Sequence, residues 1–309
     1  MPNCAPPSGR RVTATLVAAA LILAGAAPAA ASTLAIQQGN EWRTFWNSER
    51  APSRWSAADP TLVRALKWHR LAKGLEWATV RLACPAPVWR ARLIVARVDP
   101  REVRLSLAMD LTDMRPAWSI DRAPRDAILA VNAGQFVSAP WGWVTMDGAQ
   151  RFRPGYGPLS SAISVDAAGN VRWAHGDSLL DPTGVVAGFQ SYPTLLAGDG
   201  AVPLALRSAT GGVSLTHRDA RLAIGETRDG KLLIAMTRFD VMGDMGGGVP
   251  LGPTTPEMAA ILGALGASDA MMLDGGISAQ LLLRDPSKKA PLRWPGIRKV
   301  PLALIVRPR

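Results

Sequence analysis

Three short segments combine polar side chains with glycines in a way that could build a chemical site. The first is Asn132-Ala133-Gly134-Gln135-Phe136, which directly follows the apolar run Ile128–Val131. Two amides flank a glycine that permits a tight turn, and amide groups hydrogen-bond well to sugar hydroxyls. The segment therefore predicts a polar lining for a sugar, although an Asn-x-Gly sequence also forms ordinary turns.

The second segment supplies cations. Arg218-Asp219-Ala220-Arg221 leads into the apolar run Leu222–Gly225. An arginine at the start of a buried strand can present two parallel N–H groups to a phosphate or a carboxylate. An internal ion pair between arginine and aspartate explains the same residues equally well, so both interpretations stay open.

The third segment places a carboxylate at the expected end of a buried strand. The apolar run Ala270–Leu273 is followed at once by Asp274-Gly275-Gly276. A plain Asp-Gly turn is the alternative to a functional carboxylate. Because the preceding run is wholly apolar, we favour the functional interpretation.

The sequence lacks the motifs of several other kinds of site: zinc sites, serine nucleophiles and nucleotide-binding loops. The chain has three histidines without paired spacing and two cysteines, which gives a zinc site little support. It contains no Gly-x-Ser-x-Gly, and the glycine-rich stretch Gly243–Gly248 does not have the spacing of a phosphate-binding loop or a dinucleotide fingerprint. We predict no metal site and no required cofactor, although a carboxylate such as Asp274 beside backbone carbonyls can hold calcium.

The elements that position these segments are mostly strands. From Leu75 onward, short alternating or continuous apolar runs are separated by Asp-Gly and Gly-Asn turns. Asp229-Gly230 between two apolar runs predicts a hairpin. One helix is expected from the capping threonines Thr254 or Thr255 to Gly266.

The N-terminal region differs in composition. Residues 32–73 are rich in Trp, Arg and Ala, and Asp59 followed by Pro60 predicts a helix start. We therefore expect an α+β fold, with mostly antiparallel sheet packed with a few helices and a helical N-terminal preface. The expected divisions are a signal at 1–31, an extension at 32–73 and the main domain at 74–309.

The first 31 residues have the order of a secretory signal. Arg10 and Arg11 precede the apolar stretch Val12–Ala27, and the small residues Ala29-Ala30-Ala31 follow. This order predicts cleavage after Ala31, with an uncleaved anchor helix as the alternative. No later segment has the length of a membrane span, so we expect an exported protein, periplasmic or secreted.

Charge and composition narrow the partners. The 309 residues are 48% hydrophobic and carry a formal charge of +11. The hydrophobic content excludes a disordered polyelectrolyte. The lysines and arginines are scattered singly, so the charge predicts attraction of acidic ligands in general and not nucleic acid.

In their order along the chain, these segments resemble the phosphodiester glycosidase family. The resemblance spans roughly residues 74–306; each motif is weak alone, and the six in the right order are specific. The matching segments are Asn132–Phe136, Pro140-Trp141-Gly142 with Asp147-Gly148, Pro193–Leu196, Arg221–Gly225, Gly252–Glu257 and Leu273–Ser278.

The resemblance implies a hydrolase that cleaves a sugar-1-phosphodiester at the anomeric C–O bond, giving free sugar and a phosphomonoester. It implies Asp274 at the anomeric carbon, as nucleophile or as base for water, and Arg221 at the phosphate. Glu257 is a second candidate carboxylate, although the first turn of a helix also favours it for electrostatic reasons. The substrate contacts implied are Asn132, Gly134, Gln135, Gly275, Gly276 and Ser278.

Three departures from the family pattern motivate a second hypothesis. Ala133 replaces a glycine, Gln135 replaces an aromatic residue, and Ile277 interrupts a glycine run. These changes alter the shape and polarity of the expected pocket. The alternative is a non-catalytic exported protein that binds acidic cell-surface polysaccharide or assists its assembly. The expected partner is thus a sugar phosphodiester or an acidic glycan.

Overall fold

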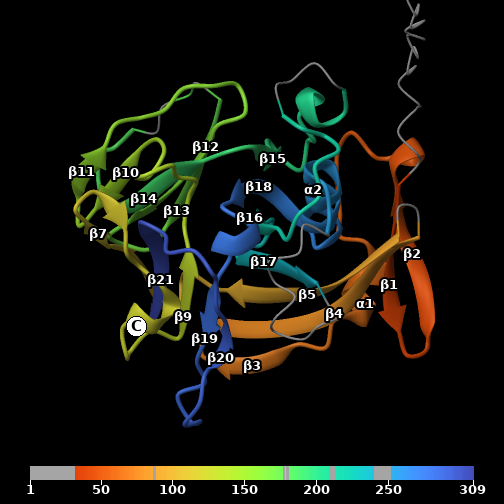
Figure 1. The fold of residues 1–309 in the computed structure, drawn as a ribbon, viewed down its shortest axis with the longest axis horizontal. Coiled ribbons are helices and arrows are strands. Elements are labelled where there is room, and N and C mark those ends of the chain that lie inside the picture. The colour runs from red at the N-terminus through yellow and green to blue at the C-terminus, as the bar shows by residue number, and fades with distance from the viewer. Residues whose placement is uncertain (1–31, 86–87, 177, 179–180, 209–212, 240–251) are drawn as a thin grey trace, which may run out of the picture. The chain divides into compact units, whose positions relative to one another are not determined.

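The computed structural model of this chain is built mainly from strands (Figure 1). It describes residues 32–309 except 86–87, 177, 179–180, 209–212 and 240–251. The expected signal at 1–31 and the glycine-rich stretch Gly243–Gly248 lie outside the described residues. The described strands form one nine-stranded sheet, two five-stranded sheets and a two-stranded ribbon.

The nine-stranded sheet contains β16 and β18, next to which two of the segments singled out in the sequence lie. Its strand order is β15-β18-β16-β17-β5-β4-β1-β2, with β3 also paired to β4, and its pairings are antiparallel. The strands are β1 (Thr33–Gln38), β2 (Glu41–Asn47), β3 (His69–Ala72), β4 (Leu75–Pro85), β5 (Val88–Val98), β15 (Thr194–Leu196), β16 (Leu222–Thr227), β17 (Leu232–Phe239) and β18 (Ala267–Leu273).

Two five-stranded sheets complete the β structure. Their orders are β20-β19-β9-β21-β6 and β11-β10-β14-β12-β13. The first contains β6 (Val103–Met109), β9 (Leu129–Asn132), β19 (Leu281–Leu283), β20 (Leu292–Trp294) and β21 (Leu302–Pro308). The second contains β10 (Val144–Met146), β11 (Ala149–Phe152), β12 (Ser161–Asp166), β13 (Val171–His175) and β14 (Val185–Ser191), while β7 (Leu111–Thr112) and β8 (Arg115–Pro116) form the ribbon.

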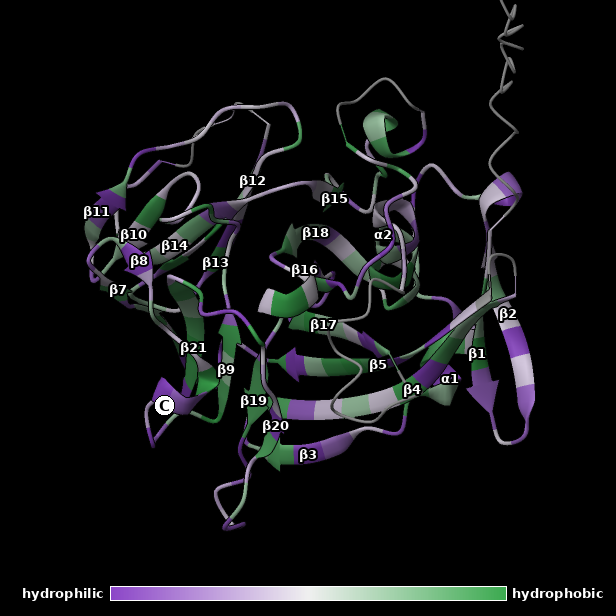
Figure 2. Cartoon of the chain, viewed as in Figure 1, coloured by the Kyte–Doolittle hydropathy of each residue, from purple (hydrophilic) through white to green (hydrophobic). Residues whose placement is uncertain are grey.

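The three sheets share one hydrophobic core. Ile224 of β16, Val131 of β9 and Phe189 of β14 belong to a single cluster of buried side chains. Figure 2 colours β9, β19 and β21 mostly hydrophobic, as expected for strands covered on both faces. Burying this apolar area from water is the main force that holds the sheets together.

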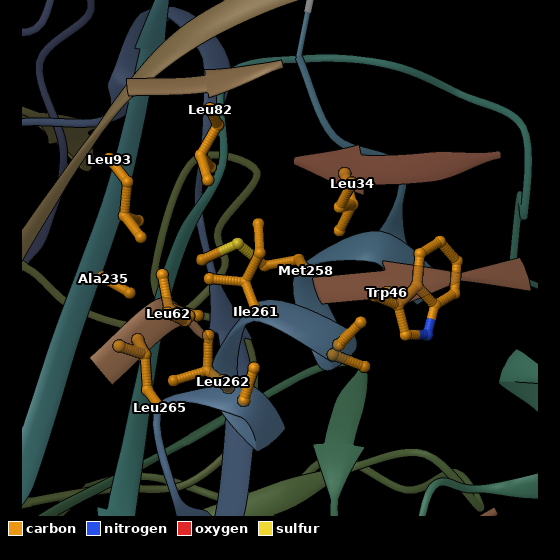
Figure 3. Close-up of a cluster of buried hydrophobic side chains, with 14 of the residues drawn as sticks. Leu34, Trp46, Leu62, Leu82, Leu93, Ala235, Met258, Ile261, Leu262 and Leu265 are labelled. Carbon is orange, nitrogen blue, oxygen red and sulfur yellow. The ribbon is translucent and has the colours of Figure 1, made fainter. Parts of the chain in front are cut away.

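The opposite face of the nine-stranded sheet is covered by helices. Helix α2 (Thr255–Ala264) contacts β15 and β18, and its Met258 and Ile261 pack with Leu62 of α1 (Pro60–Ala65) and Leu34 of β1 (Figure 3). The predicted capping threonine is Thr254, whose side chain accepts a hydrogen bond from the backbone N–H of Glu257. This second core fixes where α2 begins, close to the candidate site.

The expectation of an α+β fold with a helical preface is wrong, because the described chain is mostly β. In the 32–73 region only α1 is α-helical, and it ends after six residues, although Asp59 caps it as predicted. The remainder forms β1, β2 and β3, which join the nine-stranded sheet. In β1 the residues Leu34, Ala35 and Ile36 are buried in succession, and this short apolar run is a strand signal that the Trp-rich and Arg-rich composition obscured.

The C-terminal elements agree with the sequence. Strands β16 and β17 pair antiparallel as the expected hairpin, and Gly230 in its turn has a φ of +78°. Helix α2 is followed by Gly266, whose φ of +93° suits the end of a helix. In the described part of the chain, none of the helices is both long enough and apolar enough to cross a lipid bilayer.

Candidate functional site

Four chain segments meet at the C-terminal end of β18. They are the loop after β9, the turn after β18, the segment before β16 and the loop before α2. Asp274 donates its backbone N–H to the carbonyl of Gly134 at 3.1 Å, and Gly276 donates to the carbonyl of Ala220 at 2.7 Å. The Arg221 guanidinium reaches the fourth segment by donating from Nε to the carbonyl of Pro253 at 3.0 Å. The three segments singled out in the sequence are therefore joined in one place.

Asp274 stands at the exit of β18, as the sequence indicated. Its Oδ2 atom is buried and has no hydrogen-bond partner among the described residues. An unpaired buried carboxylate oxygen carries an unfavourable desolvation free energy. Buried titratable groups with shifted pKa values occur preferentially at functional sites, where a ligand or a reaction uses them.

The surroundings of Asp274 set its protonation. Burial raises the pKa of the Asp274 carboxyl above its usual range, and the nearby charge of Asp219 adds to this effect. A hydrogen bond from Ser278 and the charge of Arg298 act in the opposite direction. The net raised pKa makes Asp274 a carboxyl that can exchange a proton closer to neutrality than an ordinary aspartate.

The amides of the first segment hold the backbone. Asn132 is 1% exposed; its Nδ2 donates to the carbonyl of Asp274 at 2.8 Å, and its Oδ1 accepts from the backbone N–H of Gln280 at 2.9 Å. Gln135 is half-buried, and its Nε2 donates to the carbonyl of Tyr192 at 3.2 Å. Both side chains thus tie neighbouring loops together, and Asn132 connects β9 directly to the turn that carries Asp274.

The arginines of the second segment have different partners. Arg218 forms a two-pronged ion pair with Glu257, with N–O distances of 2.7 and 2.9 Å. Arg221 donates to the carbonyls of Pro253 and His217, and burial lowers its pKa. Within the described residues no ion pair joins either arginine to Asp219, so the Arg-Asp pairing considered from sequence is absent there.

Glu257 is fully engaged in holding structure. It is 1% exposed, and its side chain accepts from the backbone N–H of Thr254 in the capping box of α2. It also pairs with Arg218 and accepts a hydrogen bond from the Ser32 hydroxyl. The carboxylate therefore has several partners already, unlike Asp274.

The glycines of the third segment admit close backbone contacts. A Cβ atom on Gly275 would lie 2.6 Å from the carbonyl oxygen of Ala220, and one on Gly276 would lie 2.6 Å from Oδ2 of Asp219. Gly276 also has a φ of +53°, which disfavours other residues. Ser278 is 2% exposed and lies close enough to Asp274 to influence it.

Two charged residues at the site were missed as site residues in the sequence. Asp219 packs against Gly276 and adds a second carboxylate near Asp274. Arg298 lies 4.4 Å from the ring centroid of Phe136 and donates to the carbonyl of Val137 at 3.2 Å. The sequence suggests for Asp219 only the role of an arginine's partner, and it gives Arg298 no motif at all. Only the tertiary contacts place these two residues at the site.

Aromatic side chains stand beside the first segment. The rings of Trp141 and Tyr192 meet edge to face with centroids 4.8 Å apart. The backbone N–H of Trp141 donates to the carbonyl of Gln135 at 2.8 Å, which fixes this pair next to the loop after β9. The described residues hold no group of three or more His, Cys, Asp or Glu placed to share a metal ion, and calcium at Asp274 stays a prediction from the sequence.

Comparison with known proteins agrees with this arrangement. The sequence model of the phosphodiester glycosidase family matches residues 125–307, which include β9, the Asp219 segment, α2 and the turn at Asp274. The chain belongs to the phosphodiester glycosidase family. A search of curated proteins found no match.

Solved structures share the fold. The catalytic domain of zebrafish N-acetylglucosamine-1-phosphodiester alpha-N-acetylglucosaminidase, auto-inhibited by its pro-peptide, is similar with a TM-score of 0.60 and 18% identity, covering 78% of this chain and 86% of that one. A Burkholderia pseudomallei protein classed as exported has a TM-score of 0.53 and 14% identity, covering 79% of this chain and 96% of that one. At these identities the likeness concerns the fold.

Proposed function

We propose that this protein is an exported hydrolase that cleaves a sugar-1-phosphodiester at the anomeric C–O bond, releasing free sugar and a phosphomonoester. The observation that carries the proposal is the unpaired buried oxygen of Asp274 at the exit of β18. Membership of the phosphodiester glycosidase family supports the general reaction. The name of the zebrafish relative, which acts on an N-acetylglucosamine phosphodiester, supports the class of substrate.

In this proposal Asp274 acts at the anomeric carbon. A glycosidic reaction passes through a cationic sugar, which a carboxylate stabilises or captures. Because the departing phosphate is already a good leaving group, little proton donation is needed. Asp274 can then serve as nucleophile or as the base that activates water, and its ionised form is the active one.

In this proposal the cationic side chains stabilise the negative charge of the departing phosphate. Arg221 is held by Pro253 and His217, so its charge is fixed in position before substrate binds. Arg298 is more exposed and near enough to influence the carboxyl of Asp274. Fixed positive charge close to a departing phosphate lowers the barrier by electrostatic stabilisation. We assign to Arg221 the role of a fixed positive charge that acts on the phosphate through its electric field. We assign to Arg298 direct contact with the phosphate.

The sugar is placed against the first segment. Trp141 and Tyr192 offer apolar ring surface next to Gln135 and Gly134. Sugars combine apolar C–H faces with hydroxyl groups, and pockets that bind them combine aromatic rings with a few polar groups. Gly275 and Gly276 admit Ala220 and Asp219 close to the backbone. The roles of Gly275, Gly276, Gln135 and Ser278 as substrate contacts stay predictions.

The first experiment is phosphomonoester release from a panel of sugar-1-phosphodiesters that includes nucleotide sugars. The protein from Ser32 onward is compared with its Asp274→Asn variant. We expect turnover in the parent and a loss of roughly a thousandfold or more in kcat for the variant. Turnover that persists in Asp274→Asn would place the reaction elsewhere.

The alternative is a binding protein for acidic cell-surface polysaccharide. The observation that favours it is that Glu257, the second candidate carboxylate, is engaged by Arg218 and by the cap of α2, which leaves one of the two candidate carboxylates for catalysis. The same experiment separates the two. Acidic glycan binding at the Asp274 site, without turnover on any substrate of the panel, supports the alternative. A parent that turns substrate over, with an Asp274→Asn variant that binds it but does not turn it over, supports the hydrolase.

A further inference from the structure

One edge of β4 is covered at its two ends by different strands. β3 pairs with residues Leu75–Trp77, and β1 pairs with Leu82 and Ala83 on the same edge, while β5 occupies the other edge along its whole length. Among the described strands, neither β3 nor β1 pairs with residues 78–81 of β4, which lie between these two paired stretches. A sheet edge left open in this way presents backbone polar groups to a ligand.

A groove of about 640 Å³ lies at this opening. It is bounded by the turn of the β1–β2 hairpin and by the C-terminal end of α1. The described residues that line it include four basic side chains, two amides and no acidic residue. The basic residues are Arg64, Lys67, His69 and Arg81, and the amides are Gln37 and Gln38.

The walls of the groove are held by hydrogen bonds. Gln38 donates from Nε2 to the carbonyl of Thr61 in α1 at 2.9 Å, and Arg81 donates from Nη1 to Oε1 of Gln37 at 3.4 Å. The hairpin, the helix and β4 are therefore joined around the groove. A site that is formed before binding loses less conformational entropy when a ligand enters.

The groove carries net positive charge. Arg64 and Lys67 are exposed and have no carboxylate within ion-pair distance among the described residues. Two acidic residues on the strands that border the groove pair with other arginines: Glu41 pairs with Arg43 at 3.1 Å, and Glu76 accepts a hydrogen bond from Nε of Arg97 at 3.1 Å. The charges of Arg64 and Lys67 are thus available to an outside anion.

One residue of the groove lining has an aromatic neighbour on the adjacent strand. Trp42 lies opposite Gln37 in the hairpin and is 38% exposed. The guanidinium of Arg90 lies 5.6 Å from its ring centroid. The two amides and several cations of the groove match a ligand that carries hydroxyl groups and negative charge together.

We propose that this groove binds a segment of acidic polysaccharide, with sugar carboxylates at Arg64 and Lys67 and sugar hydroxyls at Gln37 and Gln38. Nucleic acid fits less well, because single strands are held by series of stacked aromatic rings, and the described residues that line the groove include no Trp, Tyr or Phe. The groove is separate from Asp274: three strands lie between β4 and β18, which at about 4.8 Å per strand puts them roughly 19 Å apart.

The test measures binding of polygalacturonate to the whole protein, by titration calorimetry at low salt, with dextran and polyuridylate as comparison polymers. The test variant is Arg64→Ala with Lys67→Ala. The matched control is Arg115→Ala with Lys289→Ala, which removes two positive charges from exposed positions on β8 and after β19. Melting temperatures establish that both variants are folded, and Arg64→Lys with Lys67→Arg is a second test that keeps the charges.

We expect the test variant to bind polygalacturonate roughly fivefold or more weakly, the control to change less than twofold, and the charge-preserving variant to bind like the parent. Dextran is expected not to bind. Equal weakening in test and control variants would overturn the proposal, because it would indicate attraction to the overall charge. Polyuridylate bound more tightly than polygalacturonate, with the same dependence on Arg64 and Lys67, would overturn it in favour of nucleic acid. Because Asp274 is not involved, the result does not depend on the hydrolase activity.

Discussion

At the scale of single residues, Asp274 differs from the other acidic side chains near the site. Glu257 has an arginine and a helix cap as partners, whereas Asp274 keeps one buried oxygen without a partner in the described structure. Both lie in segments that the sequence singled out, and both were candidates for catalysis. Their hydrogen-bond partners thus distinguish Glu257, a structural carboxylate, from Asp274, which is available for chemistry.

The charges around Asp274 lead to a prediction about the pH dependence of the proposed activity. The charge of Arg298 lowers the pKa of Asp274, and the charge of Asp219 raises it. Because ionised Asp274 is the proposed active form, Arg298→Gln should move the acidic limb of kcat/KM to higher pH, and Asp219→Asn should move it to lower pH. The measurement is a pH profile of phosphomonoester release for both variants. If the acidic limb shifts in the same direction in the two variants, the assignment is contradicted.

A second prediction concerns stability. Burial raises the pKa of Asp274, so the folded state binds this proton more tightly than the unfolded state. Ionised Asp274 then destabilises the fold, and this cost is absent below the unfolded pKa and grows as the pH rises through the folded pKa. Asp274→Asn should therefore gain more in melting temperature relative to the parent at pH 7 than at pH 4, as scanning calorimetry can measure. A larger gain at pH 4 would show that the carboxyl is not destabilised in the fold.

At the scale of elements, α2 and the segment before β16 are connected through Glu257. Its carboxylate caps α2 at Thr254 and pairs with Arg218, so one side chain fixes the helix start against the loop that carries Arg221. The sequence indicated the helix start and its cap, because these depend on neighbouring residues. It did not indicate the ion pair, which joins residues 39 positions apart.

The connection predicts how Glu257 variants behave. Glu257→Ala should lose about 3–5 kcal/mol of unfolding free energy, because it leaves the Arg218 charge, whose side chain is only 18% exposed, without its carboxylate partner. Glu257→Gln keeps an acceptor for the cap of α2 and should lose less. Urea denaturation measures both. If Glu257→Gln is stable and retains turnover, Glu257 is structural; a stable variant without turnover would restore it as a catalytic carboxylate.

At the scale of the whole molecule, the family match and the folded unit have different extents. The family model matches residues 125–307, yet β1–β5 lie before this range and supply five strands of the nine-stranded sheet. Leu34, Ile36 and Leu62 of the N-terminal region are 0% exposed and belong to the same cluster as α2. The 32–73 region therefore forms part of the core under the candidate site.

This packing predicts the result of a truncation. A chain that starts at Gly74 loses these three buried side chains, each worth about 1.5–3 kcal/mol, and so loses free energy comparable to the roughly 5–15 kcal/mol that stabilises a typical domain. It should fail to fold, while the chain from Ser32 folds. Circular dichroism melting curves of the two chains test this. A cooperative transition in the shorter chain would show that residues 32–73 are dispensable.

The sequence by itself determined the local features of this protein. The strand before Asp274, the β16–β17 hairpin, the cap of α2 and the order of the family motifs follow from neighbouring residues, and the comparisons confirm the family. The composition of the 32–73 region led to the wrong prediction of a helical preface, because tryptophan and arginine occur in partly exposed strands as well as in helices.

Only the tertiary structure decided which polar groups are available for chemistry. Asn132 and Glu257 match motif positions, yet their hydrogen bonds are made within the fold, and Asp219 and Arg298 lie at the site without a sequence signal. The groove at β4 depends on two strands that pair with different ends of one edge. The physical reason is the same in each case: a side chain's partners are set by contacts between residues far apart in the chain, which local pattern does not encode.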